Sequence, residues 1–214
     1  MYDLANSLFP MYPHSALICG QTGCGKTEFI LDLISTCYLH FFEHIVIICP
    51  TIQWNRAYQN RKWIWADDEV YLCNLENISL QQALEFYYKV FRGDETLIII
   101  DDCAATKELK FRSHTTVGKK CMISELAFSG RHTNQSVWIL SQKYNSVLKD
   151  FREQLKWVCL FYCKDRDSFQ NCLRENDVVP NAGTRDTIAG ILKQRKHTKL
   201  ILRTDQPTDY CIVG

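Results

Sequence analysis

The stretch "GQTGCGKT", residues 20–27, decides the fold of this chain. It matches the pattern G-x-x-x-x-G-K-[ST] and lies between the apolar run "SALICG" (15–20) and a helical pattern in which Phe29, Leu33 and Cys37 recur at four-residue spacing. A strand, a glycine-rich turn and a helix in this order let backbone N–H groups and the helix N-terminus converge on phosphate oxygens. The full match in this context favours a phosphate-binding loop (P-loop) over a chance glycine turn.

Each fixed position of this loop has a chemical role toward a nucleotide. Lys26 can reach the terminal phosphates of ATP, and the hydroxyl of Thr27 can hold Mg²⁺. The tryptophans of "WNRAYQNRKWIW" (54–65) are expected to pack or to cover the adenine side of the site. The predicted nucleotide-binding residues are Gly20, Gln21, Thr22, Gly23, Cys24, Gly25, Lys26 and Thr27.

Apolar runs alternate with helical patterns along the chain. Near-continuous apolar runs are typical of strands buried on both faces, and their alternation with helices predicts an α/β fold with a mostly parallel central sheet flanked by helices. We expect a single domain over residues 1–214, with a core at about 14–175 and a C-terminal extension at about 176–214, in which "TKLILRT" indicates an edge strand. The expected strands are 15–20, 44–50, 96–101, 136–142 and 156–163, and the expected helices are 29–38, 79–92, 119–129 and 165–175.

The composition excludes fibrous and disordered classes. Of 214 residues, 46% are hydrophobic, and 25 basic against 24 acidic residues leave a net charge of +1, so nucleic-acid binding must come from local patches. The 11 cysteines stand singly in apolar runs, as core thiols of a reducing compartment do. No apolar run approaches the ~20 residues of a membrane-spanning helix, and the N-terminus lacks a signal-peptide pattern. We therefore expect an intracellular, non-secreted protein without a membrane partner.

Two carboxylates follow the apolar run "TLIII". A P-loop site needs an acidic partner for Mg²⁺ at the end of a buried strand, and Asp101 fits that role. Asp102 is then placed to orient or deprotonate the attacking water. The alternative is that Asp102 caps a following helix, since aspartate favours N-cap positions.

The stretch "GRHTNQSVWILSQ" (130–142) sets an arginine and a glutamine at opposite ends of one strand. If this strand lies between the P-loop strand and the Asp101 strand, Gln142 lies beside the terminal phosphate, where its amide can donate to phosphate and accept from water. The eleven residues to Arg131, at ~3.3 Å each, put that side chain too far away to share the pocket. Arg131 could instead reach the nucleotide of a neighbouring subunit and stabilise the transition state there, or it is a surface or salt-bridge arginine.

In this order and at this spacing, "GQTGCGKT", "LIIIDDC" and "SGRHTNQSVWILSQ" resemble the HerA–FtsK superfamily of ring-forming DNA translocases. The resemblance is to its viral genome-packaging branch, the poxvirus-type, virophage and Polinton-like packaging ATPases, and covers roughly residues 14–175. It implies a RecA-like P-loop NTPase core of the ASCE type, ATP-driven movement of double-stranded DNA, and a homo-oligomeric ring, commonly a pentamer or hexamer. It further implies a capsid or portal partner, and a location at viral assembly sites in the host cytoplasm or nucleus, or in the virion.

The resemblance also gives roles to single residues. Lys26 corresponds to the Walker lysine, Gln142 to the sensor glutamine and Arg131 to an arginine acting in trans. Many relatives carry Asp-Glu where this chain has Asp101 and Asp102, which bears on Asp102 as the base, although paired aspartates are familiar in the poxvirus-type branch. The predicted catalytic residues are Lys26, Asp102, Gln142 and Arg131, and the predicted metal ligands are Thr27 and Asp101.

DNA contact must come from local charge, and two segments qualify. The segment 107–120 interleaves basic and aromatic side chains and could track phosphates in a ring pore. The segment 193–203 holds five Lys or Arg residues and no acidic one. For both, the alternative is a solvated polar face, and neither carries base-reading chemistry, so binding should be independent of DNA sequence. The predicted DNA-binding residues are Lys107, Lys110, Arg112, Lys119 and Lys120.

The sequence thus predicts an ATP-hydrolysing DNA translocase that packages viral DNA, with three alternatives. A cellular HerA-type translocase would share every catalytic residue. A P-loop kinase would transfer phosphate to a small acceptor. A nucleotide-gated DNA-binding module would bind ATP without hydrolysing it, and the carboxylate of Asp102 disfavours that interpretation.

Overall fold

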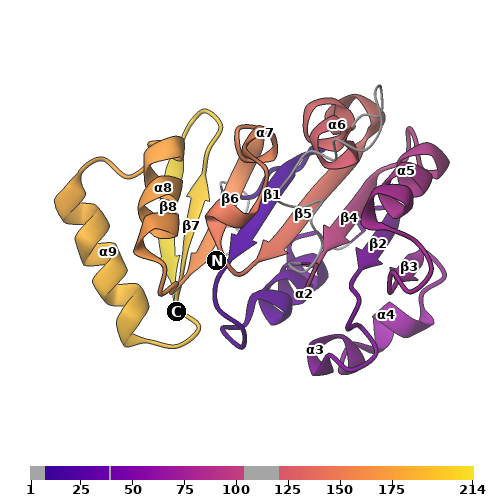
Figure 1. Cartoon of the computed structure of the whole chain (residues 1–214), viewed down its shortest axis with the longest axis horizontal. Helices are drawn as coiled ribbons and strands as arrows, with labels where there is room; N and C mark the ends of the chain where they lie inside the picture. The colour runs from indigo at the N-terminus through magenta and orange to yellow at the C-terminus, as the bar shows by residue number, and fades with distance from the viewer. Residues whose placement is uncertain (1–7, 39, 104–120) are drawn as a thin grey trace.

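The computed structural model describes residues 8–38, 40–103 and 121–214. One eight-stranded sheet runs through this part of the chain, in the order β3-β2-β4-β5-β1-β6-β7-β8 (Figure 1). Neighbours from β3 to β6 are parallel, whereas β7 pairs antiparallel with both β6 and β8. The strands are β1 (Ser15–Cys19), β2 (His44–Ile48), β3 (Val70–Cys73), β4 (Thr96–Ile100), β5 (Gln135–Ser141), β6 (Leu155–Phe161), β7 (Lys199–Arg203) and β8 (Asp209–Val213).

Helices cover both faces of the sheet. Successive side chains of β1 point to opposite faces: Leu17 packs in the layer under α5 to α9, and Ile18 packs in the layer under α2, α3 and α4. The helices are α2 (Lys26–Thr36), α3 (Arg56–Gln59), α4 (Lys62–Ala66), α5 (Leu80–Val90), α6 (Met122–Ser129), α7 (Lys149–Arg152), α8 (Arg166–Asn176) and α9 (Ala182–Gln194), with single 3-10 turns η2 (Gly130–Thr133) and η3 (Tyr144–Ser146).

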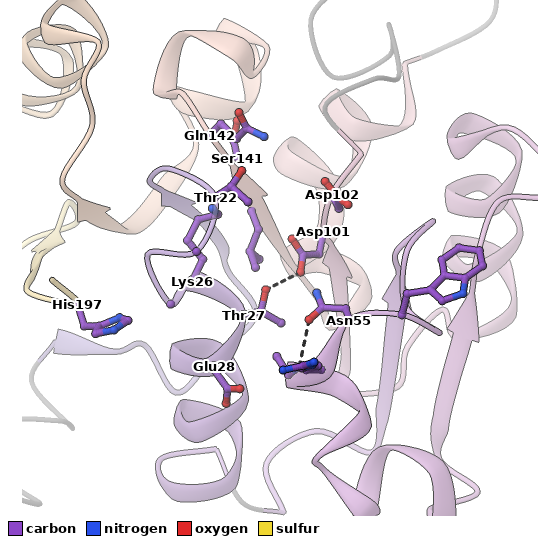
Figure 2. Close-up of a pocket in the computed structure, with 16 residues that line it drawn as sticks. Thr22, Lys26, Thr27, Glu28, Asn55, Asp101, Asp102, Ser141, Gln142 and His197 are labelled. Carbon is purple, nitrogen blue, oxygen red and sulfur yellow. Dashed lines mark hydrogen bonds between the residues drawn. The ribbon is translucent and has the colours of Figure 1, made fainter.

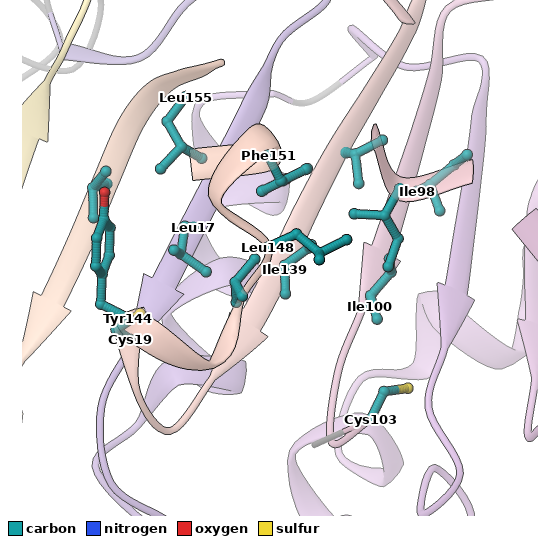
Figure 3. Close-up of a cluster of buried hydrophobic side chains, with 14 of the residues drawn as sticks. Leu17, Cys19, Ile98, Ile100, Cys103, Ile139, Tyr144, Leu148, Phe151 and Leu155 are labelled. Carbon is teal, nitrogen blue, oxygen red and sulfur yellow. The ribbon is translucent and has the colours of Figure 1, made fainter. Parts of the chain in front are cut away.

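The core fixes the relative positions of the three central strands. Leu17 of β1, Ile98 of β4 and Ile139 of β5 lie together in one buried layer (Figure 3). Full burial of each such side chain contributes about 1.5–3 kcal/mol. The strand register pairs Ile100 with Ile139, and Cys19 with Ser141, so the carboxyl ends of these parallel strands meet at one edge of the sheet. The residues that follow each strand are thereby brought close together.

The predicted α/β architecture with a mostly parallel sheet is confirmed, and β5 does lie between β4 and β1. Two strands were missed: β3 has only four residues at one edge, and β8, at the other edge, has five residues and is half exposed. "TKLILRT" does form a late strand, β7, but its expected edge position is wrong, because β7 pairs with a strand on each side. The helix expected at 119–129 begins at Met122, and residues 119–120 lie outside the described residues.

The structure agrees in part with the prediction that the cysteines are core thiols. No disulfide joins the 11 cysteines; six of them are buried and five are partly exposed. Burial raises the pKa of Cys49 to about 11, so its thiol stays neutral within the core. Among the described helices, none combines the length and apolar character needed to cross a membrane.

Candidate nucleotide-binding site

The P-loop connects β1 to α2 and curls over a lysine. Gly25, which precedes α2, has φ 99°, a conformation open to glycine at little cost. A Cβ atom on Gly20 would lie 2.6 Å from both Cys24 Sγ and Phe161 Cβ, so only glycine fits against β6 there. The Lys26 ammonium donates to the carbonyls of Gly20 (2.8 Å) and Gln21 (3.1 Å), which holds it beneath the loop. This geometry is that of a phosphate-binding loop.

A cavity of about 580 Å³ opens above the P-loop at the carboxyl edge of the sheet. Figure 2 shows Thr27 facing Asp101, Gln142 near Ser141, and His197 on the opposite side of the loop. Of the sequence-predicted catalytic and metal residues, the cavity brings together all but Arg131. Its lining residues are Thr22, Gly23, Gly25, Lys26, Thr27, Glu28, Trp54, Asn55, Arg56, Ala57, Asp101, Asp102, Leu140, Ser141, Gln142 and His197.

Asp101, directly after β4, is buried and fixed by two hydroxyl donors. Its Oδ2 accepts hydrogen bonds from Thr27 Oγ1 and from Tyr58 OH, each at 2.8 Å. Burial raises the pKa of Asp101, while the two hydrogen bonds and Lys26 act in the opposite direction. Burial also raises the pKa of Tyr58, so its phenol stays protonated and keeps donating. The carboxylate of Asp101 is therefore held in one orientation toward the P-loop.

Sequence reasoning missed Tyr58. Its ring is fully buried under the sheet, and only its hydroxyl reaches the site. In the sequence it is one aromatic residue among several in "WNRAYQNRKWIW", and no motif distinguishes it from a core residue. The signal that could have found it is the rule that the hydroxyl of a buried tyrosine needs a hydrogen-bond partner.

Asp102 lies at the rim of the cavity and is exposed. Its backbone has φ 53°, a left-handed conformation that aspartate tolerates better than most residues. Its Oδ2 accepts a hydrogen bond from Thr51 Oγ1 at 2.8 Å, beyond the end of β2. Asp101 and Asp102 thus have different surroundings, one buried and one open to solvent, which fits a division between metal partner and base.

Gln142 follows β5 and lines the same cavity, as the sequence predicts for a sensor glutamine. The loop after it is bound to α8 and its N-terminal turn: Lys143 pairs with Asp165 (3.1 Å), and the backbone N–H of Asn145 donates to Ser168 Oγ (3.1 Å). The position of Gln142 is therefore coupled to α8.

Arg131 lies in η2, at the amino end of β5. It is exposed, its Nε donates to His132 Nε2 at 3.4 Å, and it lines a separate hollow with His14 and Lys156. The structure does not bring it into the cavity of its own chain, in agreement with the expectation that Arg131 and Gln142 cannot share a pocket.

The two basic segments have different outcomes. The predicted DNA-binding residues of 107–120 lie outside the described residues. In the second segment, Arg195 and Lys196 line a hollow of about 250 Å³ against the P-loop. His197, which follows these two residues, approaches Cys24 O with its Nδ1 (2.9 Å) and has φ 70°. A Cβ atom on Gly25 would lie 2.9 Å from that ring nitrogen, so the glycine makes room for the histidine.

Fold and site together define a class. A P-loop after β1, an aspartate after β4 and a glutamine after the intervening β5 line one cavity of a P-loop NTPase fold with a RecA-like strand order, where this class of fold is expected to bind nucleotide. The chain belongs to the family described as Poxvirus A32 protein, whose model matches residues 4–205.

Similar proteins agree with this placement. The chain is 30% identical over 191 residues to the DNA packaging protein OPG160 of monkeypox virus, which covers 84% of this chain and 57% of the relative. It is 29% identical to OPG160 of vaccinia virus (strain Copenhagen), over 84% of this chain and 63% of that protein. The chain therefore spans only about three fifths of the length of these relatives.

A solved structure shares the fold. The genome packaging NTPase B204 from Sulfolobus turreted icosahedral virus 2, in complex with AMP, superimposes with a TM-score of 0.65 at 16% identity. The match covers 96% of this chain and 98% of that one. At this identity the likeness concerns the fold alone.

Proposed function

We propose that this chain is an ATP-hydrolysing motor that moves double-stranded DNA into a viral capsid. The observation that carries the proposal is the single cavity in which Lys26, Thr27, Asp101, Asp102 and Gln142 converge. Membership of the Poxvirus A32 family and the names of the relatives support the packaging role. Because the chain spans about three fifths of those relatives, the activity and partners of the whole protein are part of the proposal.

In the proposed reaction, the oxygen of water forms a bond to the γ-phosphorus of ATP. The bond from that phosphorus to the β,γ-bridging oxygen breaks, and its electron pair leaves with ADP. Asp102 accepts the proton of the attacking water and Gln142 orients that water. Lys26 exchanges its contacts with the carbonyls of Gly20 and Gln21 for contacts with phosphate oxygens.

Two residues of the site fit Mg²⁺, a hard cation that takes oxygen ligands. Thr27 Oγ1 and Asp101 Oδ2 are already 2.8 Å apart and converge on the phosphate side of the cavity. When bound with ATP, Mg²⁺ neutralises charge on the β- and γ-phosphates. Tyr58 supports this arrangement, since its hydroxyl donates a hydrogen bond to Asp101 Oδ2 and so fixes the orientation of the carboxylate.

We further propose a homo-oligomeric ring of five or six subunits, located with its capsid or portal partner at viral assembly sites inside the host cell. Of the two basic segments, 107–120 is the better candidate for DNA contact, because residues 195–197 lie against the P-loop of the same chain. Contact with phosphates would make binding independent of sequence and steeply dependent on salt.

Steady-state ATP hydrolysis with and without long double-stranded DNA, across protein concentration at one stated salt concentration, tests this function. We expect turnover that rises steeply with both, because assembly and DNA complete the motor. Turnover indifferent to both would contradict the motor and favour a P-loop kinase or a stand-alone nucleotide switch. Binding of ATP without turnover by assembled protein would favour the non-hydrolysing module.

A further inference from the structure

Arg56, the first residue of α3, lines the same cavity as Lys26, Asp102 and Gln142. It comes from the segment after β2, which no phosphate-binding motif includes, and its side chain is exposed. Lys26 and Arg56 are the two lysine or arginine side chains that line the cavity within the described part of the chain. Three carboxylates, Glu28, Asp101 and Asp102, share that lining with them.

The backbone of Arg56 is held firmly against both the P-loop helix and the metal aspartate. The Asn55 side chain accepts a hydrogen bond from Ala57 N (3.1 Å) and so caps α3, and Tyr58 joins α3 to Asp101. On the other side, Arg61 pairs with Glu28 (3.0 Å) and Asp32 (2.5 Å) of α2. The attachment point of Arg56 is therefore fixed at the cavity wall.

The guanidinium of Arg56, by contrast, has no ionic or hydrogen-bonding partner among the described residues. Across residues 8–38, 40–103 and 121–214, Arg56 forms no ion pair or side-chain hydrogen bond, whereas Arg61, five residues later, binds two carboxylates. A guanidinium is permanently charged and matches the geometry of phosphate oxygens. Arg56 thus combines a fixed backbone with a guanidinium that has no partner in the described part of the chain, at the wall of the proposed phosphate site. This combination fits a contact with a ligand better than a structural role.

We propose that Arg56 is a catalytic residue that contacts the terminal phosphate of ATP bound in its own chain. This inference rests on the proposed ATPase function and deepens it. Arg56 transfers no proton; its guanidinium stabilises the negative charge on the γ-phosphoryl oxygens while the water–phosphorus bond forms and the bond to ADP breaks. Arg131 lines a different hollow at the opposite end of β5, so the two arginines would act on different nucleotides.

The first test compares Arg56→Ala with Arg56→Lys and with Arg92→Ala, a control at an exposed arginine after α5 that lines neither cavity. We expect kcat to fall about 100-fold or more in Arg56→Ala, with the KM for ATP changed only a few-fold, because an arginine of this kind acts on the transition state. Arg56→Lys should recover part of the loss, since it restores charge but not the planar fork. Arg92→Ala should match wild type.

The second test distinguishes action within one chain from action between chains. Mixed assemblies of Lys26→Ala with Arg56→Ala should stay inactive, because no subunit then holds both residues. If Lys26→Ala protein restores turnover to Arg56→Ala, then Arg56 acts on a neighbouring nucleotide and the proposal fails. The mixture of Lys26→Ala with Arg131→Ala is the matched comparison, and recovery there is the expected sign of an arginine acting in trans.

The outcomes separate the two proposals. Wild-type protein that hydrolyses ATP while Arg56→Ala retains the wild-type kcat would overturn the role of Arg56 and leave the ATPase function standing. Wild-type protein without turnover, under the DNA and protein concentrations given above, would overturn the ATPase function itself. Thermal unfolding of Arg56→Ala should match that of Arg92→Ala, since a side chain without a partner in the described chain contributes little to stability.

Discussion

The two ends of β5 differ in what their polar residues bind. At the carboxyl end, Gln142 lines the cavity above the P-loop, and the loop after it is attached to α8. At the amino end, Gln135 donates to Tyr88 O (3.2 Å) and Asn134 donates to Gly93 O (2.9 Å), so these amides close the turn between α5 and β4. The two amides at the amino end hold the fold together, whereas the amide at the carboxyl end is open to the proposed chemistry.

The difference follows from the parallel sheet. In open α/β sheets, ligands bind outside the carboxyl ends of the strands, where the strand-to-helix loops converge. Residues with the same chemistry at the amino ends meet other turns of the chain and become structural. Substitutions at the carboxyl end should therefore change turnover, whereas changes at the amino end should change stability.

The largest effect is expected for Lys26→Ala at the carboxyl edge. Loss of the ammonium removes the cation held under Gly20 and Gln21, so ATP turnover should fall by more than about 10³-fold. Steady-state hydrolysis and binding of a fluorescent ATP analogue would measure the two losses. Full ATPase activity in this variant would remove the P-loop assignment.

Asp102→Asn should slow hydrolysis by about 10²–10⁴-fold while leaving ATP binding largely intact, since it removes only the proton acceptor. Thr51, whose hydroxyl donates to Asp102, can still donate to the amide oxygen, so the fold around the residue should persist. Single-turnover hydrolysis and nucleotide affinity would be compared. If both are lost together, Asp102 is a metal ligand or a structural residue instead.

The fold and the first set of site residues could be predicted because they depend on local pattern. The P-loop, Asp101 and Gln142 each stand directly after an apolar run, and a parallel sheet brings such positions to one edge whatever the intervening sequence. The strand order around β5 then placed the glutamine between the two motifs.

Contacts made across long sequence distances could not be predicted. His197 reaches Cys24 only because β7 pairs antiparallel with β6, and that register is not visible in a pattern of apolar residues. Tyr58 is indistinguishable from a core aromatic until its hydroxyl is seen at Asp101. The edge strands β3 and β8 could not be predicted because they have only four and five residues, and such short apolar runs do not distinguish a strand from other structure.

At the amino end of β1, a smaller effect on stability is expected when the pH is lowered. His14 is buried, its Nε2 accepts a hydrogen bond from Trp138 Nε1 (2.9 Å), and its Nδ1 donates to Tyr12 O (2.7 Å). One ring nitrogen accepts and the other donates, so the imidazole is neutral. Burial lowers the pKa of His14 from 6.5 to about 4, although Tyr12 O and Asp205 oppose the shift. The unfolded chain therefore binds a proton that the folded chain does not between these pKa values, and stability is lost as pH falls through this range.

The free energy of unfolding should decrease by about 2 kcal/mol from pH 7 to pH 5 through His14 alone. Urea unfolding of wild type and His14→Gln at both pH values isolates this contribution, because other titrating groups cancel in the difference. The stability gap between the two proteins should shrink at pH 5. A gap that stays constant would show that His14 keeps an ordinary pKa, and ATPase activity should not follow the same curve.

The smallest effect on stability is expected for the residues that support the loop after Gln142. Glu175 of α8 accepts hydrogen bonds from Tyr144 OH (2.8 Å) and Arg152 Nη1 (2.7 Å), and the Arg152 guanidinium lies over the Tyr144 ring. Tyr144 stands two residues after Gln142, so this cluster helps to hold the glutamine at the cavity. Glu175→Gln should weaken the ion pair and cost about 1 kcal/mol of stability.

If the cluster positions Gln142, Glu175→Gln should also lower kcat several-fold at an unchanged KM for ATP, because misplacement affects the transition state more than ground-state binding. Glu153→Gln, which removes the exposed pair with Lys149, is the matched control and should leave kcat unchanged. A loss of stability in Glu175→Gln with wild-type kcat would confine the cluster to structure. The residues that follow Gln142 would then have a structural role only, as the residues at the amino end of β5 do.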